Sequence, residues 1–326
     1  MSAPGRMVEV VGRFEALRLL VLGDVMLDRY IWGSVERISP EAPVPVVRVE
    51  RESTMLGGAG NVARTIASLG ARAGLVALVG DDDAGELVAD RLSDWKIDAK
   101  GVIVDPRRPT TQKTRVIAQA QQMVRFDRES DDPIPSDLAR RLLEGVAAGI
   151  READGVIVQD YGKGLLQDSV LEGVMKIVAE RALPVFIDPK GGDWGRFRGA
   201  ELVKPNQREA EAAAGMRIRC QRDVEICGSR LLEQTGARTL AITRGGEGMS
   251  FVFEDGRCAH FAGRRRPVAE ASGAGDTAIA TLALARLAGG RWSEAAALAN
   301  AAAGLVVSVP GTAAISARDL LEAVSP

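Results

Sequence analysis

The segment LRLLVLGD (residues 17–24) is a short apolar run that ends in a glycine and an aspartate. Later segments repeat this pattern: AGLVALVGD (73–81), DGVIVQD (154–160), LPVFIDP (183–189), AELVKPN (200–206) and TLAITRG (239–245). Near-continuous apolar runs of this length are typical of parallel strands that are covered on both faces. Segments with helical periodicity lie between them, at 84–95, 136–150, 168–181 and 207–215. The alternation predicts an α/β fold built on one doubly wound, mostly parallel sheet.

Two segments interrupt this alternation, at residues 31–52 and 110–127. Both alternate polar and apolar residues as strands do, and the prolines of the first segment restrict it to an edge or an exposed sheet. We therefore expect a small β-sheet lid inserted in a single domain that spans residues 1–326. The lid would also offer a surface for a homodimer.

Composition excludes several classes of function. The chain has 42 Lys and Arg against 44 Asp and Glu and no long basic tract, which argues against nucleic acid as its main partner. Its three cysteines lack the spacing of a zinc site or a disulfide framework, and neither a signal peptide nor a membrane span is evident, so we expect a cytoplasmic protein. A single histidine, His260, argues against a Ser-His-Asp hydrolase.

Polar residues follow the apolar runs at the points where the predicted strands end. In open parallel sheets, ligands bind beyond the carboxyl ends of the strands. A polar residue that merely ends its strand explains any one of these positions, but less easily all of them. The positions are Asp24, Asp28, Asp160, Asp188, Lys190, Asn206 and Arg244.

The segment EASGAGDTA (270–278) leads into a helix-forming run. Gly273, Ala274 and Gly275 would let backbone N–H groups approach a ligand, and the N-terminus of the helix adds partial positive charge. Such a loop can hold a phosphoryl group during its transfer. Asp276, in the first turn of the helix, could accept a proton from an attacking hydroxyl. The alternative is that Asp276 only caps the helix.

A second glycine-rich segment, LGGAGNVARTIASLG (56–70), also opens a helix. Gly57 and Gly58 allow close approach, and the Asn61 amide both donates and accepts hydrogen bonds, which suits a polyhydroxylated substrate. A plain helix cap and a dinucleotide loop of a dehydrogenase are the alternatives. The Walker pattern GxxxxGK[ST] is absent from the sequence, which excludes a P-loop kinase.

The segments GGAGN (57–61) and SGAGDT (272–277), with KPNQRE between them, resemble the signatures of the ribokinase/PfkB family of carbohydrate kinases. The resemblance covers nearly the whole chain. It implies a ribokinase-like fold, ATP and Mg²⁺ as cofactors, and an anion hole on the loop that precedes Asp276. It also implies that Asp276 is the catalytic base and that Asp28 contacts sugar hydroxyls.

The same resemblance assigns residues to the nucleotide. Asn206 and Glu209 would organise the magnesium-bound phosphates through hydrogen bonds and water, which makes Glu209 an indirect metal ligand. The family signature usually has Asp where this chain has Glu270, so dependence on a monovalent cation stays open. The residues expected beside the nucleotide are Thr243, Arg244, Gly246, Gly248 and Asn300.

Longer stretches, such as GDVMLDRYIWG and RISPEAPVPVV, resemble the branch of the family that phosphorylates D-glycero-β-D-manno-heptose 7-phosphate for lipopolysaccharide synthesis. The resemblance is to the form without a second nucleotidyltransferase domain. A phosphorylated sugar requires a basic clamp. Other sugar kinases and a non-catalytic sugar-phosphate sensor remain alternatives. With Asp160, the candidate substrate residues are Lys113, Arg115, Arg125, Lys163 and Lys190.

Overall fold

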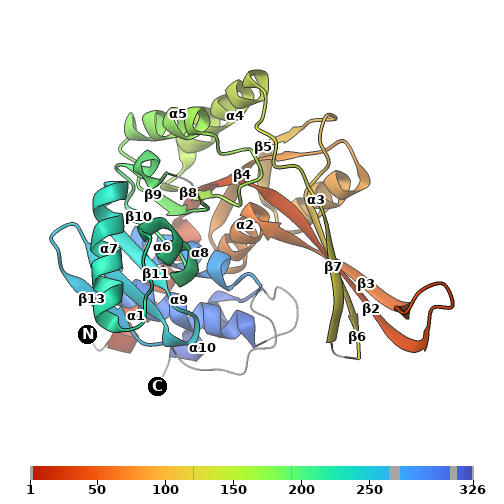
Figure 1. Cartoon of the computed structure of the whole chain (residues 1–326). Coiled ribbons are helices and arrows are strands. Elements are labelled where there is room, and N and C mark those ends of the chain that lie inside the picture. The colour runs from red at the N-terminus through yellow and green to blue at the C-terminus, as the bar shows by residue number, and fades with distance from the viewer. Residues whose placement is uncertain (1–2, 120, 192, 264–271, 309–313, 325–326) are drawn as a thin grey trace.

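The computed structural model describes residues 3–119, 121–191, 193–263, 272–308 and 314–324 (Figure 1). Within them, the main sheet has the strand order β13-β12-β11-β10-β9-β8-β1-β4-β5. Neighbouring strands are parallel except in the β11–β12 and β12–β13 pairs, which confirms the predicted α/β fold. The strands are β1 (Arg18–Gly23), β4 (Arg72–Val79), β5 (Asp98–Val104), β8 (Gly155–Gln159), β9 (Val185–Asp188), β10 (Leu202–Val203), β11 (Thr239–Thr243), β12 (Met249–Phe253) and β13 (Cys258–Phe261).

Helices cover both faces of this sheet, and each face has its own apolar core. The first core packs under α1 (Ala3–Gly12), α2 (Ala59–Ser68), α3 (Asp83–Asp94), α8 (Ala274–Leu287), α9 (Trp292–Val307) and α10 (Ala317–Val324). The second packs under α4 (Ser136–Gly149), α5 (Asp168–Ala179), α6 (Gln207–Ala214) and α7 (Gln221–Thr235). Short 3₁₀ turns complete the chain: η1 (Phe14–Ala16), η2 (Ile150–Glu152), η3 (Trp194–Phe197) and η4 (Gly245–Glu247).

A smaller sheet projects from the main body (Figure 1), and we call it the small sheet. Its order is β3-β2-β6-β7, with β2 (Val25–Ile38), β3 (Pro45–Gly58), β6 (Gln112–Ala118) and β7 (Gln121–Arg128). The strand β2 begins at Val25, ahead of the predicted lid segment, because it continues directly from β1 with only Asp24 between them. The predicted second sheet is therefore confirmed, and its root lies at the carboxyl end of the first strand.

Glycine is required where the small sheet joins the main sheet. Gly58 has a φ of 56°, and a Cβ atom there would lie 2.3 Å from the carbonyl oxygen of Asp24. A Cβ atom on Gly57 would lie 2.4 Å from Oδ2 of Asp28. Any larger residue would push β3 away from β2 at the point where β3 turns into α2.

The carboxyl ends of the central strands lie level with one another. Gly23 pairs with Gln159, and Gln159 pairs with Asp188 on the next strand. The polar residues predicted at the strand ends therefore gather at one edge of the sheet. In the described part of the chain, no helix combines the length and the apolar character needed to cross a membrane.

Candidate functional site

Asp276 is the centre of the site and is 3% exposed. It lies in the first turn of α8, after Gly273, whose φ of 80° places it in the left-handed region. Its Oδ2 accepts a hydrogen bond from Nδ2 of Asn61 at 2.8 Å. Its Oδ1 accepts from the hydroxyl of Tyr161 at 2.9 Å and from Nε2 of Gln159 at 3.1 Å. Both carboxylate oxygens are therefore held in place by donors from other elements.

The orientation of Asn61 is fixed from within α2. Arg64, one turn later on the same helix, donates from Nη2 to Oδ1 of Asn61 at 2.7 Å. With its oxygen occupied by a cation, the amide of Asn61 presents its NH₂ group to Asp276. Burial lowers the pKa of Arg64, while the nearby carboxylate of Asp276 opposes this effect.

Two aspartates at this edge of the sheet have pKa values well above that of an ordinary aspartate. Burial raises the pKa of Asp276 from 3.8 to about 6, although the hydrogen bond from Asn61 favours its charged form. Burial likewise raises the pKa of Asp24 to about 6. Asp24 accepts hydrogen bonds from the backbone N–H groups of Tyr161 at 2.9 Å and Lys163 at 3.2 Å, so it positions the loop after β8.

Other predicted substrate residues surround this centre. Asp28, on β2, is buried and forms an ion pair with Nη1 of Arg115 at 2.6 Å. Asp160 follows β8 and pairs with Nη2 of Arg196 at 2.7 Å. Burial raises the pKa of Asp160, and the guanidinium of Arg196 opposes the rise. The structure thus brings Asn61 and Asp276 into direct contact. The carboxylates of Asp28 and Asp160 are each paired with an arginine.

The basic residues predicted to hold a substrate phosphate are all paired with carboxylates. Lys163 contacts Glu129 and Asp131 at 2.8 Å each, and Lys113 contacts Asp127 and Glu129 at 3.2 Å each. Arg125, on the exposed strand β7, contacts Asp127 at 3.1 Å. An anion that bound these cations would have to compete with the acidic residues that now neutralise them.

The predicted metal-linked pair sits at the start of α6. Asn206 caps the helix by accepting from the Glu209 backbone N–H at 3.0 Å, and Glu209 accepts from the Asn206 backbone N–H at 2.9 Å. Lys190 reaches Oε1 of Glu209 at 3.2 Å, and among the described residues it is not one of the donors to Asp276. Within the described residues, no group of three or more His, Cys, Asp or Glu side chains lies close enough together to hold a metal ion.

The residues predicted beside a nucleotide also come together. Thr243 ends β11 and pairs with Asn206 through a β-bridge, and Arg244 donates its backbone N–H to Gly248. Asn300, on α9, donates to the carbonyl oxygen of Phe261 at 3.2 Å. A Cβ atom at Gly248 would lie 2.1 Å from that same carbonyl, so this residue must be glycine.

Arg244 carries an unused donor. Its guanidinium pairs with Glu247 at 2.9 Å, but its buried Nε has no hydrogen-bond partner among the described residues. A buried donor without a partner is costly, and the Nε atoms of Arg91, Arg196 and Arg286 share this state among the described residues. Gly246 lies in the same turn, η4. Glu270, the position that bears on a monovalent cation, lies outside the described residues.

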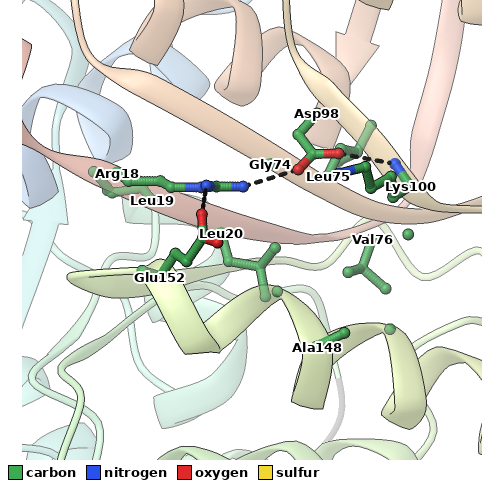
Figure 2. Close-up of a pocket in the computed structure, with 14 residues that line it drawn as sticks. Arg18, Leu19, Leu20, Gly74, Leu75, Val76, Asp98, Lys100, Ala148 and Glu152 are labelled. Carbon is green, nitrogen blue, oxygen red and sulfur yellow. Dashed lines mark hydrogen bonds and ion pairs between the residues drawn. The ribbon is translucent and has the colours of Figure 1, made fainter.

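A separate cavity of about 370 Å³ lies at the opposite edge of the sheet, where β1 and β4 begin (Figure 2). Figure 2 shows Arg18 between Asp98 and Glu152, and its distance to Asp98 is 2.8 Å. Two carboxylates thus already neutralise this cation. The cavity is remote from the carboxyl ends of the strands and shares none of the predicted site residues.

Sequence reasoning did not assign site roles to Gln159, Tyr161, Arg64 and Lys204. Gln159 and Lys204 stand at the ends of otherwise apolar strand segments, VIVQ and LVK, where a polar side chain needs a buried partner. That pattern could have identified them. Arg64 lies three residues after Asn61, a spacing that places both on one face of a helix.

Comparison with known proteins gives consistent matches. The family model described as pfkB family carbohydrate kinase matches residues 16–319. The bifunctional protein HldE of Geobacter sulfurreducens is 43% identical over 306 residues, which are 94% of this chain and 62% of that protein. The HldE of Rhodospirillum rubrum is 42% identical over 325 residues, 99% of this chain and 65% of that protein. The chain thus spans less than two thirds of these curated relatives.

Solved structures share the fold. The Arabidopsis thaliana ribokinase complexed with ribose and ATP has a TM-score of 0.77 at 21% identity, covering 95% of this chain and 99% of that one. Phosphofructokinase-2 from Escherichia coli, in complex with substrates and products, has a TM-score of 0.79 at 21% identity, with 94% and 98% covered.

The hydroxyl of Tyr161 stabilises the ionised form of Asp276, so its removal should raise the pKa of that carboxyl. In Tyr161→Phe, we expect the titration midpoint of Asp276 to move above its wild-type value of about 6. The measurement is ¹³C NMR of protein labelled at the aspartate carboxyl carbons, with Asp276→Asn identifying the resonance. An unchanged or lower midpoint would contradict the role of this hydrogen bond.

Proposed function

The chain belongs to the pfkB family of carbohydrate kinases, and from this premise we propose that it transfers the γ-phosphoryl group of ATP to the anomeric hydroxyl of D-glycero-β-D-manno-heptose 7-phosphate. The observation that carries the proposal is the buried carboxylate of Asp276 at the N-terminus of α8, held by Asn61. The choice of sugar is supported by the long sequence stretches that resemble the heptose-phosphate branch of the family.

Asp276 is suited to act as the general base. With a pKa of about 6, the carboxylate is mostly ionised at neutral pH and still binds a proton more tightly than an ordinary aspartate. Asn61 holds one oxygen, while Tyr161 and Gln159 hold the other, so the carboxylate has a fixed direction. Asp28, at the root of the small sheet, would orient other hydroxyl groups of the sugar.

The loop before α8 would hold the transferring group. Gly273, Ala274 and Gly275 place backbone N–H groups at the positive end of the helix. A Cβ placed on Gly275 would lie 3.8 Å from Nζ of Lys204 and 3.9 Å from Oδ2 of Asp188, so these two side chains border the loop at this position. When bound, ATP would supply the phosphoryl group, and Mg²⁺ would neutralise part of the negative charge on its phosphates.

The donor set of the described residues fits this nucleotide. Arg244, at the start of the turn η4, carries a guanidinium group, which suits a polyphosphate. Magnesium commonly keeps several waters and takes one or two carboxylates. Glu209, with Asn206 beside it, would supply a carboxylate that contacts the metal through one of these waters. Thr243, Gly246, Gly248 and Asn300 would line the nucleotide.

Loss of the base should abolish most activity. Asp276→Asn keeps the size of the side chain but removes proton acceptance, so we expect kcat to fall by about 10²–10⁴ with KM nearly unchanged. The measurement is ADP formation by purified protein with Mg²⁺, ATP and a panel of heptose 7-phosphate anomers, fructose phosphates, ribose and adenosine.

Each outcome of this assay is informative. Turnover confined to the heptose 7-phosphate supports the proposal. Turnover on another sugar would reject the substrate and retain the chemistry. An unaffected Asp276→Asn enzyme would reject the base, and a wild-type protein that binds the sugar phosphate without turnover would be a sensor.

The substrate phosphate is proposed to bind Lys163, whose backbone N–H donates to Asp24 and which lies two residues after Tyr161, a donor to Asp276. Because one charged hydrogen bond contributes about 1.5–3 kcal/mol, Lys163→Met should raise KM for heptose 7-phosphate about 10- to 100-fold with little change in kcat. Steady-state kinetics with unphosphorylated heptose provide the contrast, since its KM should not change. Lys176→Met, on the exposed side of α5, is the matched control. Equal KM increases for both sugars would exclude a phosphate contact.

The small sheet is proposed to join a second copy of the chain. Its strand β7 exposes Val124 by 50% and Phe126 by 54%, and Val49 on β3 is 52% exposed. Exposed apolar side chains gathered on one sheet are typical of an interface.

A charge on this surface should separate the copies. We expect wild-type protein to have the mass of a dimer in sedimentation velocity, and Phe126→Asp to shift it to the monomer because a buried unpaired carboxylate is costly. Ile226→Asp, at a 48% exposed position on α7, is the control and should remain dimeric. A monomeric wild type, or a dimer that survives Phe126→Asp, would refute this interface.

A further inference from the structure

A buried ion pair lies beside the proposed base and is not used by the reaction described above. Asp188 ends β9, and Lys204 follows β10. Nζ of Lys204 lies 3.0 Å from Oδ2 of Asp188, and the lysine is only 2% exposed. Two charges are rarely removed from water in this way without a specific reason, because desolvation offsets much of their attraction.

Gln159 connects this pair to Asp276. Its Nε2 donates to Oδ2 of Asp188 at 3.2 Å and to Oδ1 of Asp276 at 3.1 Å. One amide group therefore bridges two buried carboxylates. A Cβ atom on Gly275 would lie 3.8 Å from Nζ of Lys204 and 3.9 Å from Oδ2 of Asp188, so the pair also faces the loop before α8.

We propose that Asp188 and Lys204 are positioning residues, which orient Gln159 and fix the pH at which Asp276 ionises. The proposal rests on the proposed role of Asp276 as the base. Asp188 brings a second negative charge close to Asp276, and Lys204 neutralises it. The pair thus adjusts the proton affinity of Asp276 without touching the sugar.

The other groups that face Asp276 come from several elements. Asn61 and Arg64 lie on α2, Tyr161 follows β8, and Asp28 on β2 acts on Tyr161 and Arg64. Among the neighbouring charges, Asp188 raises the pKa of Asp276 and Lys204 lowers it. The two members of the pair therefore have opposite effects on the same carboxyl.

This opposition defines the experiment. Asp188→Asn removes a negative charge, so the titration midpoint of Asp276 should fall by about 1 pH unit or more. Lys204→Met leaves Asp188 unpaired, and the midpoint should rise by about the same amount. The measurement is ¹³C NMR of carboxyl-labelled aspartates at a series of pH values. Asp276→Asn and Asp188→Asn identify the two resonances, since coupled carboxyls titrate as a pair.

Removal of one member of a buried pair can prevent folding. The double variant Asp188→Asn/Lys204→Met removes both charges and should return the midpoint to within a few tenths of a pH unit of wild type. Lys204→Arg keeps the positive charge and should retain the wild-type midpoint. If the double variant and Lys204→Arg both fold and no variant moves the midpoint beyond those limits, the pair is only structural and the inference is overturned.

The acidic limb of kcat/KM against pH separates this inference from the proposed function. If Asp276 is the base, the limb moves with the NMR midpoint, downward in Asp188→Asn and upward in Lys204→Met. If the NMR midpoints move while the limb stays in place, the pair acts as inferred and Asp276 is not the base. Shifts of both variants in the same direction would overturn the inference.

Discussion

The buried carboxylate of Asp276 is the constraint on which the arrangement of the site depends. A charged group removed from water must be compensated by hydrogen bonds or opposite charge, or it takes up a proton. Its donors come from α2, from the end of β8 and from the loop after β8. Those elements must therefore meet the N-terminus of α8 at fixed distances. A displacement of any one of them would leave part of the carboxylate without a partner.

The same rule explains the cations at this edge of the sheet. Asp28 has Arg115, Asp160 has Arg196, and Asp188 has Lys204. Asp24 takes backbone N–H groups instead of a side chain, and its pKa is about 6, as is that of Asp276, which likewise accepts hydrogen bonds from uncharged donors. Burial raises the pKa of these two carboxyls, and hydrogen bonds from uncharged donors offset the rise only in part, so both pKa values lie near the range that proton transfer requires.

Sequence predicted the sheet well because the central strands are buried on both faces and read as apolar runs. The apolar runs alone did not place β5, β12 and β13 in this sheet. β5, with the sequence DAKGVIV, is only partly covered at one edge of the sheet, and β13 is half-buried at the other edge. β12 is buried but antiparallel to both of its neighbours, so it falls outside the regular alternation of parallel strands and helices. Gly-rich segments predicted Asn61 and Asp276, whose contact joins residues 215 positions apart. The pairing of Lys163 with Glu129 and Asp131 could not be predicted, since long flexible side chains meet there through tertiary structure.

The path of the chain links the small sheet to this centre. β1 passes through Asp24 into β2, which carries Asp28, and β3 returns through Gly58 to α2, which carries Asn61. Asp24 holds the loop of Tyr161 and Lys163 by backbone hydrogen bonds. A shift of the small sheet would therefore reach Asp28, Asn61 and Tyr161 together, because short covalent or hydrogen-bonded connections join them. Since Asn61 and Tyr161 hold opposite oxygens of Asp276, the position of the small sheet and the proton affinity of that carboxyl depend on the same contacts.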